Sequence, residues 1–190
     1  MKKHAIIIHG WAGFPEEGWF PWLKSELEKR GYEVQVPAMP DAERPTIAAW
    51  VGKLSEMIGA IPDGGEIVLV GHSIGCQTIL RTLEMMHGSH VTKVVLVASW
   101  LTLTNLESKE EEEIAEPWIK TPIDFSKIKG KADSFTVILS DNDDWVPFEE
   151  TKNDFETKLG ATVVTEHDKG HFSGEDGITE LQSVLDAVIK

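Results

Sequence analysis

The sequence predicts a three-layer α/β fold built on a mainly parallel sheet of six strands. Short apolar runs alternate along the chain with amphipathic helical patterns, an order typical of βαβ units. The runs lack polar alternation, as in Ile67–Val70, which indicates strands buried on both faces. With 190 residues, of which 41% are hydrophobic, the chain is predicted to form a single domain over residues 1–190.

The first part of the chain alternates strands and helices up to a turn. Gly31 is a typical helix stop, and Thr46 is a typical helix N-cap before an apolar stripe. Proline and glycine mark the loops between these patterns. The expected elements are a strand at 5–8, a helix at 20–30, a strand at 32–36, a helix at 47–58 and a turn at 62–65.

The rest of the chain continues the alternation. Leu181, Leu185 and Val188 form an apolar stripe with helical spacing near the end of the sequence. The expected elements are a strand at 67–70, a helix at 74–84, strands at 91–98 and 135–139, a helix at 147–159, a strand at 161–165 and a helix at 178–189.

Residues 101–130 form the least regular segment. The four consecutive glutamates at 110–113 favour a solvated helix face or a mobile loop over an acidic docking tail. Because the segment follows the fourth strand, we expect it at the carboxyl edge of the sheet, where it is placed to act as a short lid.

Composition excludes several classes of partner. The net charge is −14 and the isoelectric point is about 4.9, which argues against nucleic acid and anionic membranes as partners. The sequence shows no convincing metal-ligand spacing, no dinucleotide-binding glycine motif and no phosphate-binding loop. We therefore expect no metal and no cofactor.

Two features bear on localisation. The single cysteine, Cys76, excludes an internal disulfide framework and fits a reducing compartment. The apolar run Ile6–Ile8 after two lysines is too short for an export signal, and Glu16 and Glu17 follow it. The sequence therefore predicts a cytoplasmic protein.

Gly71–Gly75 matches the pattern G-x-S-x-G between a strand and a helix. In this context the pattern indicates a nucleophile elbow, with Ser73 exposed at the top of the sheet. Gly71 and Gly75 lack a β-carbon, so the strand and the helix can approach closely around a strained serine. The alternative is that Ser73 only caps the following helix.

A catalytic serine needs a histidine base. His171 is the preferred candidate because it lies in a glycine-flanked loop between the last strand and the last helix, at the same edge of the sheet as Ser73. The remaining candidates are the runner-up His167, His72 in the elbow but pointing away from the serine, His9 as a local hydrogen-bonding residue, and His87 and His90 at the opposite edge.

The histidine in turn needs a carboxylate to orient it. The segment Ser140–Pro147 follows the fifth strand, and the chain order Ser, Asp, His is the one that such elbows use. Asp143 is favoured, followed by Asp144 and then Asp141. Clustered Asp and Asn residues also form turns and helix caps, which is the alternative reading of this segment.

The loop after the first strand is expected to complete the site. If the first strand lies beside the third, with the second outside it, His9–Trp11 lies against the elbow. The backbone N–H groups of Trp11 and Ile74 are then predicted to form the oxyanion hole.

Aromatic residues also follow several strand ends. They favour an apolar substrate pocket, although packing beneath loops is the alternative. Trp19, Trp22 and Trp50 are expected to pack on helices, and Cys76 to be a small buried core residue. The predicted pocket residues are His9, Gly10, Trp100 and Trp145.

Several of these segments together resemble a known family. The sequence is similar to the small serine hydrolases of the α/β-hydrolase superfamily that include retinoblastoma-binding protein nine and the YdeN-like proteins. The resemblance implies Ser73 as nucleophile, Asp143 as acid and His171 as base, in a minimal fold without a large cap and with strand order 2-1-3-4-5-6. The segments that carry it are His9–Trp11, Gly71–Cys76, Ser140–Pro147 and Gly170–His171.

The sequence also departs from the family pattern. Asp144 stands where proline is frequent, and Ile74 stands where leucine is usual. No L-x-C-x-E segment is present, so the resemblance implies no partnership with the retinoblastoma protein.

The predicted function is that of a carboxylesterase-like serine hydrolase acting on a small, hydrophobic acyl ester through an acyl-enzyme. Thioesterase and peptidase activities use the same machinery and remain open. A non-catalytic protein that binds a partner on a hydrolase scaffold is the alternative from another class. The sequence leaves the protein partner and the oligomeric state open.

Overall fold

The computed structural model describes residues 2–62, 64–88 and 90–190 and contains a six-stranded sheet. The strand order is β2-β1-β3-β4-β5-β6, and all adjacent strands are parallel. This confirms the predicted fold class and strand order. The strands are β1 (Lys3–Ile8), β2 (Tyr32–Gln35), β3 (Glu66–His72), β4 (Val91–Val97), β5 (Ala132–Ser140) and β6 (Thr162–Glu166).

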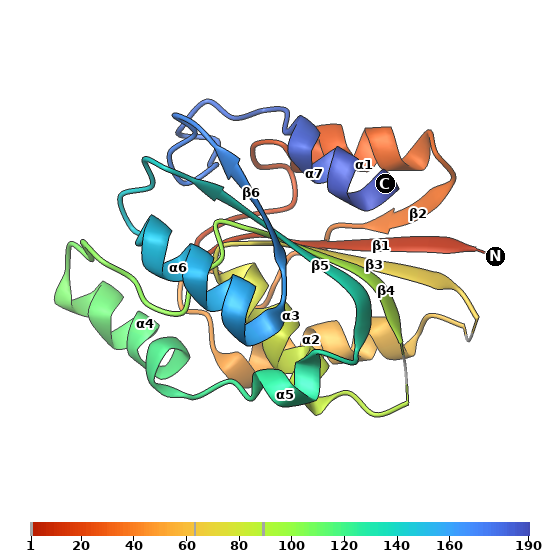
Figure 1. Cartoon of the computed structure of the whole chain (residues 1–190), viewed down its shortest axis with the longest axis horizontal. Coiled ribbons are helices and arrows are strands. Elements are labelled where there is room, and N and C mark those ends of the chain that lie inside the picture. The colour runs from red at the N-terminus through yellow and green to blue at the C-terminus, as the bar shows by residue number, and fades with distance from the viewer. Residues whose placement is uncertain (1, 63, 89) are drawn as a thin grey trace.

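Helices cover both faces of the sheet, which gives three layers (Figure 1). α1 and α7 lie on one face, and α2, α3 and α5 lie on the other. The helices of the described chain are α1 (Phe20–Glu28), α2 (Ile47–Gly59), α3 (Ile74–Met85), α4 (Lys109–Lys120), α5 (Phe125–Ile128), α6 (Phe148–Asp154), the π-helical turn η1 (Phe155–Leu159) and α7 (Gln182–Ile189).

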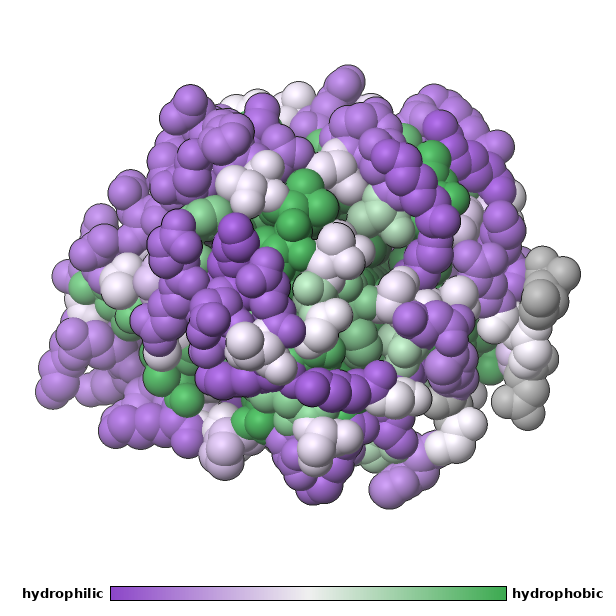
Figure 2. Space-filling model, in the orientation of Figure 1, coloured by the Kyte–Doolittle hydropathy of each residue, from purple (hydrophilic) through white to green (hydrophobic). Residues whose placement is uncertain are grey.

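The central strands are apolar on both faces because each face has its own core. In β1, Ile6 and Ile8 pack with α2 and α3, whereas Ala5 and Ile7 pack with α1 and α7. Side chains alternate between the two faces of a strand, so an uninterrupted apolar run fills both cores. Outside these cores, hydrophilic side chains cover most of the face seen in Figure 2.

Element ends differ from the expected ones where loops override local preference. The last helix begins at Gln182 and not at Ile178, because the Ile178 N–H donates to the Ser173 carbonyl and Gly177 has a φ of +75°. A helix cannot continue through this turn. The helix expected over 147–159 is divided into α6 and the π-helical turn η1.

The irregular segment after β4 contains α4, which packs beside the carboxyl edge of the sheet. Ser108 and Glu111 cap α4 reciprocally. The helix is anchored by buried Trp118, whose carbonyl accepts a hydrogen bond from Arg81 at 2.7 Å. Glu112 and Glu113 are exposed, as expected of a solvated helix face.

The described residues contain neither a candidate membrane-spanning helix nor a candidate metal-binding cluster. No helix there is long and apolar enough to cross a membrane. Within the same residues, no group of three or more His, Cys, Asp and Glu side chains is placed to hold a metal ion. Cys76 is a free, buried thiol whose pKa is raised by burial.

Candidate active site

The turn between β3 and α3 has the strained geometry of a nucleophile elbow. Ser73 has a φ of +51°, a conformation that side chains other than glycine rarely adopt. A β-carbon on Gly71 would come within 2.8 Å of the Cys76 nitrogen, and one on Gly75 within 2.5 Å of the Ile8 carbonyl oxygen. Both glycines are therefore needed for the strand and the helix to approach each other.

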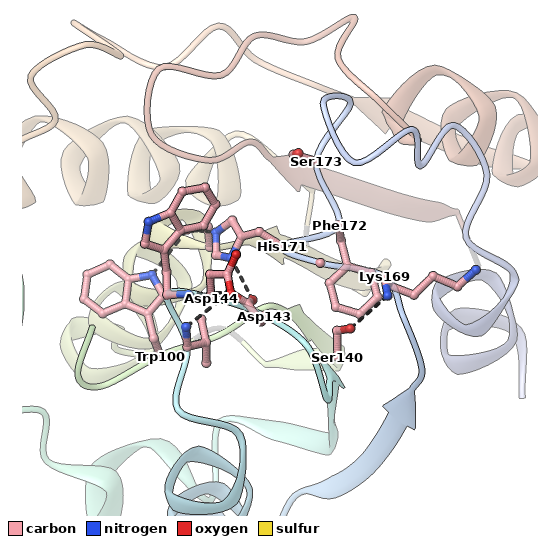
Figure 3. A network of polar contacts seen from close by, with 12 residues as sticks. Trp100, Ser140, Asp143, Asp144, Lys169, His171, Phe172 and Ser173 are labelled. Carbon is pink, nitrogen blue, oxygen red and sulfur yellow. Dashed lines mark hydrogen bonds and ion pairs between the residues drawn. The ribbon is translucent and has the colours of Figure 1, made fainter. Parts of the chain in front are cut away.

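Three side chains from different loops form one hydrogen-bonded chain. His171 Nε2 lies 2.9 Å from Ser73 Oγ. On the other side of the ring, His171 Nδ1 lies 2.7 Å from Asp143 Oδ2 (Figure 3). Because a carboxylate only accepts hydrogen bonds, the Nδ1 proton points at Asp143 and Nε2 is free to accept from the serine. The Asp143 and His171 side chains are 2% and 12% exposed, so the pair is shielded from water.

The three aspartates after β5 have different surroundings. Asp143 faces His171, and its second oxygen accepts from the Trp145 and Val146 N–H groups at 3.0 and 3.2 Å. Asp141 pairs with exposed His167, and Asp144 is exposed. The structure thus brings Asp143 to the site and leaves the other two carboxylates outside it.

The loop that carries His171 is tied to the loop after β5. The Lys169 N–H donates to Ser140 Oγ at 3.0 Å (Figure 3). The Gly170 N–H donates to Asn142 Oδ1 at 2.8 Å. These contacts hold the histidine loop at a fixed distance from Asp143. This role of Ser140 and Asn142 was not predicted, because a serine and an asparagine after a strand are equally typical of a plain turn.

His72 is buried beside this hydrogen-bonded chain and makes no hydrogen bond to Ser73 within the described residues. Its Nε2 donates to the His171 carbonyl at 2.7 Å, and Nδ1 has no hydrogen-bond partner in the described chain. Burial lowers the pKa of His72 to about 3, which keeps the ring neutral at physiological pH. The ring therefore braces the His171 backbone without adding charge.

The loop after β1 lies against the elbow, as expected. A β-carbon on Gly10 would come within 3.5 Å of the Ser73 β-carbon, and Trp11 lines the same cavity as Ser73. Within the described residues, the backbone N–H groups of Trp11 and Ile74 donate no hydrogen bond. Both remain free for an oxyanion.

Two of the expected pocket residues do not line the cavity. His9 is buried and accepts a hydrogen bond from the Met39 N–H at 3.0 Å. Trp100 is also buried, and its indole N–H donates to Ser73 Oγ at 3.3 Å. The expectation that these two rings form pocket walls is therefore wrong, because both turn into the protein. The Trp100 indole contacts Ser73 from the interior of the protein.

Ser73 and His171 line a cavity of about 1280 Å³ at the carboxyl edge of the sheet. Gly10 and Trp145 line it, as expected, and the Trp145 ring stands edge-on to His171 with 5.1 Å between ring centroids. Further apolar walls, from the loop after β1 and from the segment around α4, are Phe14, Leu103, Leu106 and Ile114.

Comparison with known proteins agrees with this geometry. Residues 5–190 match the family described as serine hydrolase. The chain belongs to the serine hydrolase family. YdeN of Bacillus subtilis strain 168 is 30% identical over 190 residues, covering 99% of this chain and 95% of YdeN. The expected resemblance is thereby confirmed.

Other members and neighbours extend the comparison. The crystal structure of the B. subtilis ydeN gene product matches this serine hydrolase with a TM-score of 0.86 at 29% identity, covering 98% of this chain and 96% of that one. Serine hydrolase RBBP9 of Rattus norvegicus is 24% identical, covering 90% of this chain and 88% of its own. Est1E of Butyrivibrio proteoclasticus with bound ferulic acid shares the fold with a TM-score of 0.71 at 15% identity, covering 99% of this chain and 90% of its own.

Proposed function

We propose that this serine hydrolase cleaves acyl esters by a Ser73–His171–Asp143 triad through an acyl-enzyme. The observation that carries the proposal is the continuous hydrogen-bonded chain from Asp143 through His171 to Ser73 on the wall of a large cavity. A serine capping a helix needs no such chain. Here Ser73 makes no side-chain cap bond to α3.

The first half of the reaction forms the acyl-enzyme. Ser73 Oγ attacks the acyl carbonyl while His171 Nε2 takes the hydroxyl proton. Asp143 holds the Nδ1 proton and stabilises the imidazolium. The Trp11 and Ile74 N–H groups bind the oxyanion, each contributing about 3 kcal/mol of transition-state stabilisation. His171 then gives its proton to the leaving alcohol, and the ester bond to Ser73 remains.

The second half repeats these steps with water. His171 takes a proton from a water molecule that attacks the Ser73 ester. The second tetrahedral intermediate then collapses to the free acid while His171 returns that proton to Ser73 Oγ, which restores the enzyme. The apolar walls at Phe14, Leu103 and Trp145 suit an acyl chain or an aryl group.

We further propose that the reaction takes place in the cytoplasm, since Cys76 is the only cysteine and is a buried thiol.

Hydrolysis of p-nitrophenyl esters across acyl lengths tests the proposal. The wild type should turn over, and Ser73→Ala should lose at least about 1,000-fold in kcat, because the nucleophile is gone. The chain-length profile reports the size of the pocket. Absence of turnover in the folded wild type across esters, thioesters and peptides would contradict the proposal and favour a partner-binding role.

A further inference from the structure

The cavity around Ser73 carries many more acidic than basic side chains. Arg44 is the one lysine or arginine among the described residues that line it. Carboxylates come from the loop after β1, from the loop before α2, from the start of α4 together with the residue before its N-cap, and from the loop before α7. They are Glu16, Glu17, Glu43, Glu107, Glu110, Glu111 and Glu175.

The basic charge in this lining is already paired. Arg44 forms an ion pair with Glu110. The Glu111 carboxylate is already engaged at the start of α4, where it belongs to the helix cap. Its Oε2 accepts a hydrogen bond from the Glu107 N–H at 2.6 Å. These contacts leave no free positive charge in the lining to balance the remaining carboxylates.

The remaining carboxylates are unbalanced. Within residues 2–62, 64–88 and 90–190, they form no ion pair. Buried His72 is neutral and adds no charge to the cavity wall. A cleft lined by charges of one sign concentrates ligands of the opposite sign. The carboxylates without an ion pair are Glu16, Glu17, Glu43, Glu107 and Glu175.

Glu17 is the carboxylate set most firmly beside the triad. It is half-buried between the loop after β1 and the loop that follows His171. A β-carbon added to Gly13 would come within 2.6 Å of Glu17 Oε2, and one added to Gly174 within 3.7 Å of Glu17 Cγ. Burial raises the pKa of Glu17, with a further contribution from the like charge of Glu175. A cation bound here would relieve both effects.

Aromatic rings stand exposed on the same cavity. Phe14 is 53% exposed and Trp145 is 36% exposed, and both line the cavity with Glu17. Exposed apolar side chains that gather on one cavity, unlike ones scattered singly over a surface, indicate a ligand surface. Aromatic faces together with carboxylates are the chemistry that binds ammonium groups, because a ring face attracts a cation.

Resting on the proposed hydrolase function, we infer that the substrate of this site is an acyl compound that carries an ammonium group. Glu17 binds the cation together with the rings of Phe14 and Trp145, while Ser73 attacks the acyl carbonyl. Anionic esters and thioesters are disfavoured by the same carboxylates. Glu17 is thus a specificity-determining residue and takes no part in proton transfer.

Isosteric ester pairs test this inference. One pair is a p-nitrophenyl ester whose acyl chain ends in a trimethylammonium group and the same ester ending in a tert-butyl group. The other is butyrylthiocholine and its tert-butyl analogue, which places the cation in the leaving group. Each pair keeps size and shape and changes only the charge. The measured quantity is the ratio of kcat/KM within a pair.

The cationic member should be preferred about tenfold in at least one pair at low ionic strength. The preference should shrink in about 1 M salt, where the screening length is about 3 Å. Glu17→Gln should lower the ratio at least about threefold, because it removes the charge and keeps the side-chain shape. The ratio is insensitive to partial unfolding, since both esters meet the same enzyme sample.

Glu56→Gln is the matched control. Glu56 is exposed on α2 and is not part of the cavity lining, so this variant makes the same change in net charge and should leave the ratio unchanged. Ratios of one or less in both pairs would overturn the inference. A ratio that Glu17→Gln and Glu56→Gln change equally would also overturn it.

Binding to the Ser73→Ala variant separates this inference from the proposed function. Titration calorimetry with the same esters measures affinity without turnover, and the cationic member should bind about tenfold more tightly. Equal affinities combined with normal hydrolysis of all four esters would refute the cation site and leave the hydrolase function standing. Preferential binding of the cationic ester by a protein that hydrolyses none of the four esters would support the cation site and refute the hydrolase function.

Discussion

Asp143 and Asp144 are neighbours in the chain with opposite surroundings. Asp143 is buried against His171 Nδ1, whereas Asp144 is exposed. Asp143→Asn should lower kcat about 1,000- to 10,000-fold, because an amide does not fix the Nδ1 proton or stabilise the imidazolium. Asp144→Asn should change kcat by less than about twofold. Equal losses in p-nitrophenyl ester hydrolysis would refute the assignment of the acid.

Trp100 gives Ser73 a second hydrogen-bond partner. Its buried indole N–H donates to Oγ at 3.3 Å, so it holds the serine side chain and stabilises negative charge that develops there. Trp100→Phe should slow inactivation by a fluorophosphonate about fivefold to tenfold. KM for esters should change little, because Trp100 does not line the cavity.

Trp50→Phe is the control for Trp100→Phe. This variant also removes an indole N–H from a hydrogen bond, in this case a part-buried one to the Pro40 carbonyl at 2.7 Å. Among the described residues, Trp50 makes no hydrogen bond to Ser73. Both variants should lose similar stability. If both also slow inactivation equally, Trp100 acts on packing alone.

Residues fixed by a local pattern were predictable, and residues fixed by distant packing were not. Ser73 follows from the elbow motif, and His171 follows from its loop at the same edge of the sheet. The inward turn of His9 depends on Met39, which is remote in sequence. No local pattern reports whether a ring at a strand end faces a cavity or the core, and this is why the expected roles of His9 and Trp100 were wrong.

At the scale of elements, the elbow depends on the close approach of α3 to β1. A β-carbon on Gly75 would lie 2.5 Å from the Ile8 carbonyl oxygen and 2.7 Å from the His9 one. Gly75→Ala should therefore lower the free energy of unfolding by at least about 2 kcal/mol, since rigid backbone must move. Urea unfolding measures the change.

Gly52→Ala is the matched comparison for Gly75→Ala. Gly52 lies inside α2 with nothing within 4 Å of an added β-carbon. The substitution should raise the free energy of unfolding by about 0.5–1 kcal/mol, because alanine favours the helix. Two changes of the same sign and size would show that helix propensity, and not the close approach, governs Gly75.

The elements themselves were largely predictable because period and caps are local. Thr46 caps α2 as expected, with its side chain accepting from the Ala49 N–H. The start of α7 was not predictable, because the tertiary contacts of the loop from Ser173 to Ile178 keep it out of the helix. The cap formed by Ser108 and Glu111 on α4 lies in a segment whose regular pattern was too weak to recognise.

At the scale of the whole molecule, buried histidines make stability depend on pH. The pKa of His72 falls from 6.5 to about 3 on burial, and burial also lowers the pKa of His9. Below about pH 6.5 the unfolded chain binds a proton at His72 that the folded chain does not. Stability therefore falls as the pH falls, by about 1.4 kcal/mol per unit from this residue, until about pH 3.

Urea unfolding at several pH values checks this slope. Between about pH 6.5 and pH 5, His72 alone should remove about 2 kcal/mol from the free energy of unfolding. His72→Gln keeps an N–H donor for the His171 carbonyl and removes the titrating ring, so its slope should be flatter. Identical slopes in the two proteins would refute the account of His72.

The sheet order was predictable from the chain as a whole. Uninterrupted apolar strands require helices on both faces, and the site requires β1 beside β3, as Ile8 opposite Gly71 shows. The charge of the cavity was not predictable, because its carboxylates come from four separate segments that only the fold brings together. The net charge alone does not distinguish an acidic cavity from an ordinary solvated acidic surface.

Covalent capture of the nucleophile is the decisive test of Ser73 as the residue that attacks the substrate. The protein would be treated with a fluorophosphonate and digested, and the modified peptide identified by mass spectrometry, with Ser73→Ala and His171→Gln alongside. We expect one adduct, on Ser73, with no labelling of Ser73→Ala and at least about 100-fold slower labelling of His171→Gln. An adduct on another residue, or undiminished labelling of folded Ser73→Ala, would contradict this assignment.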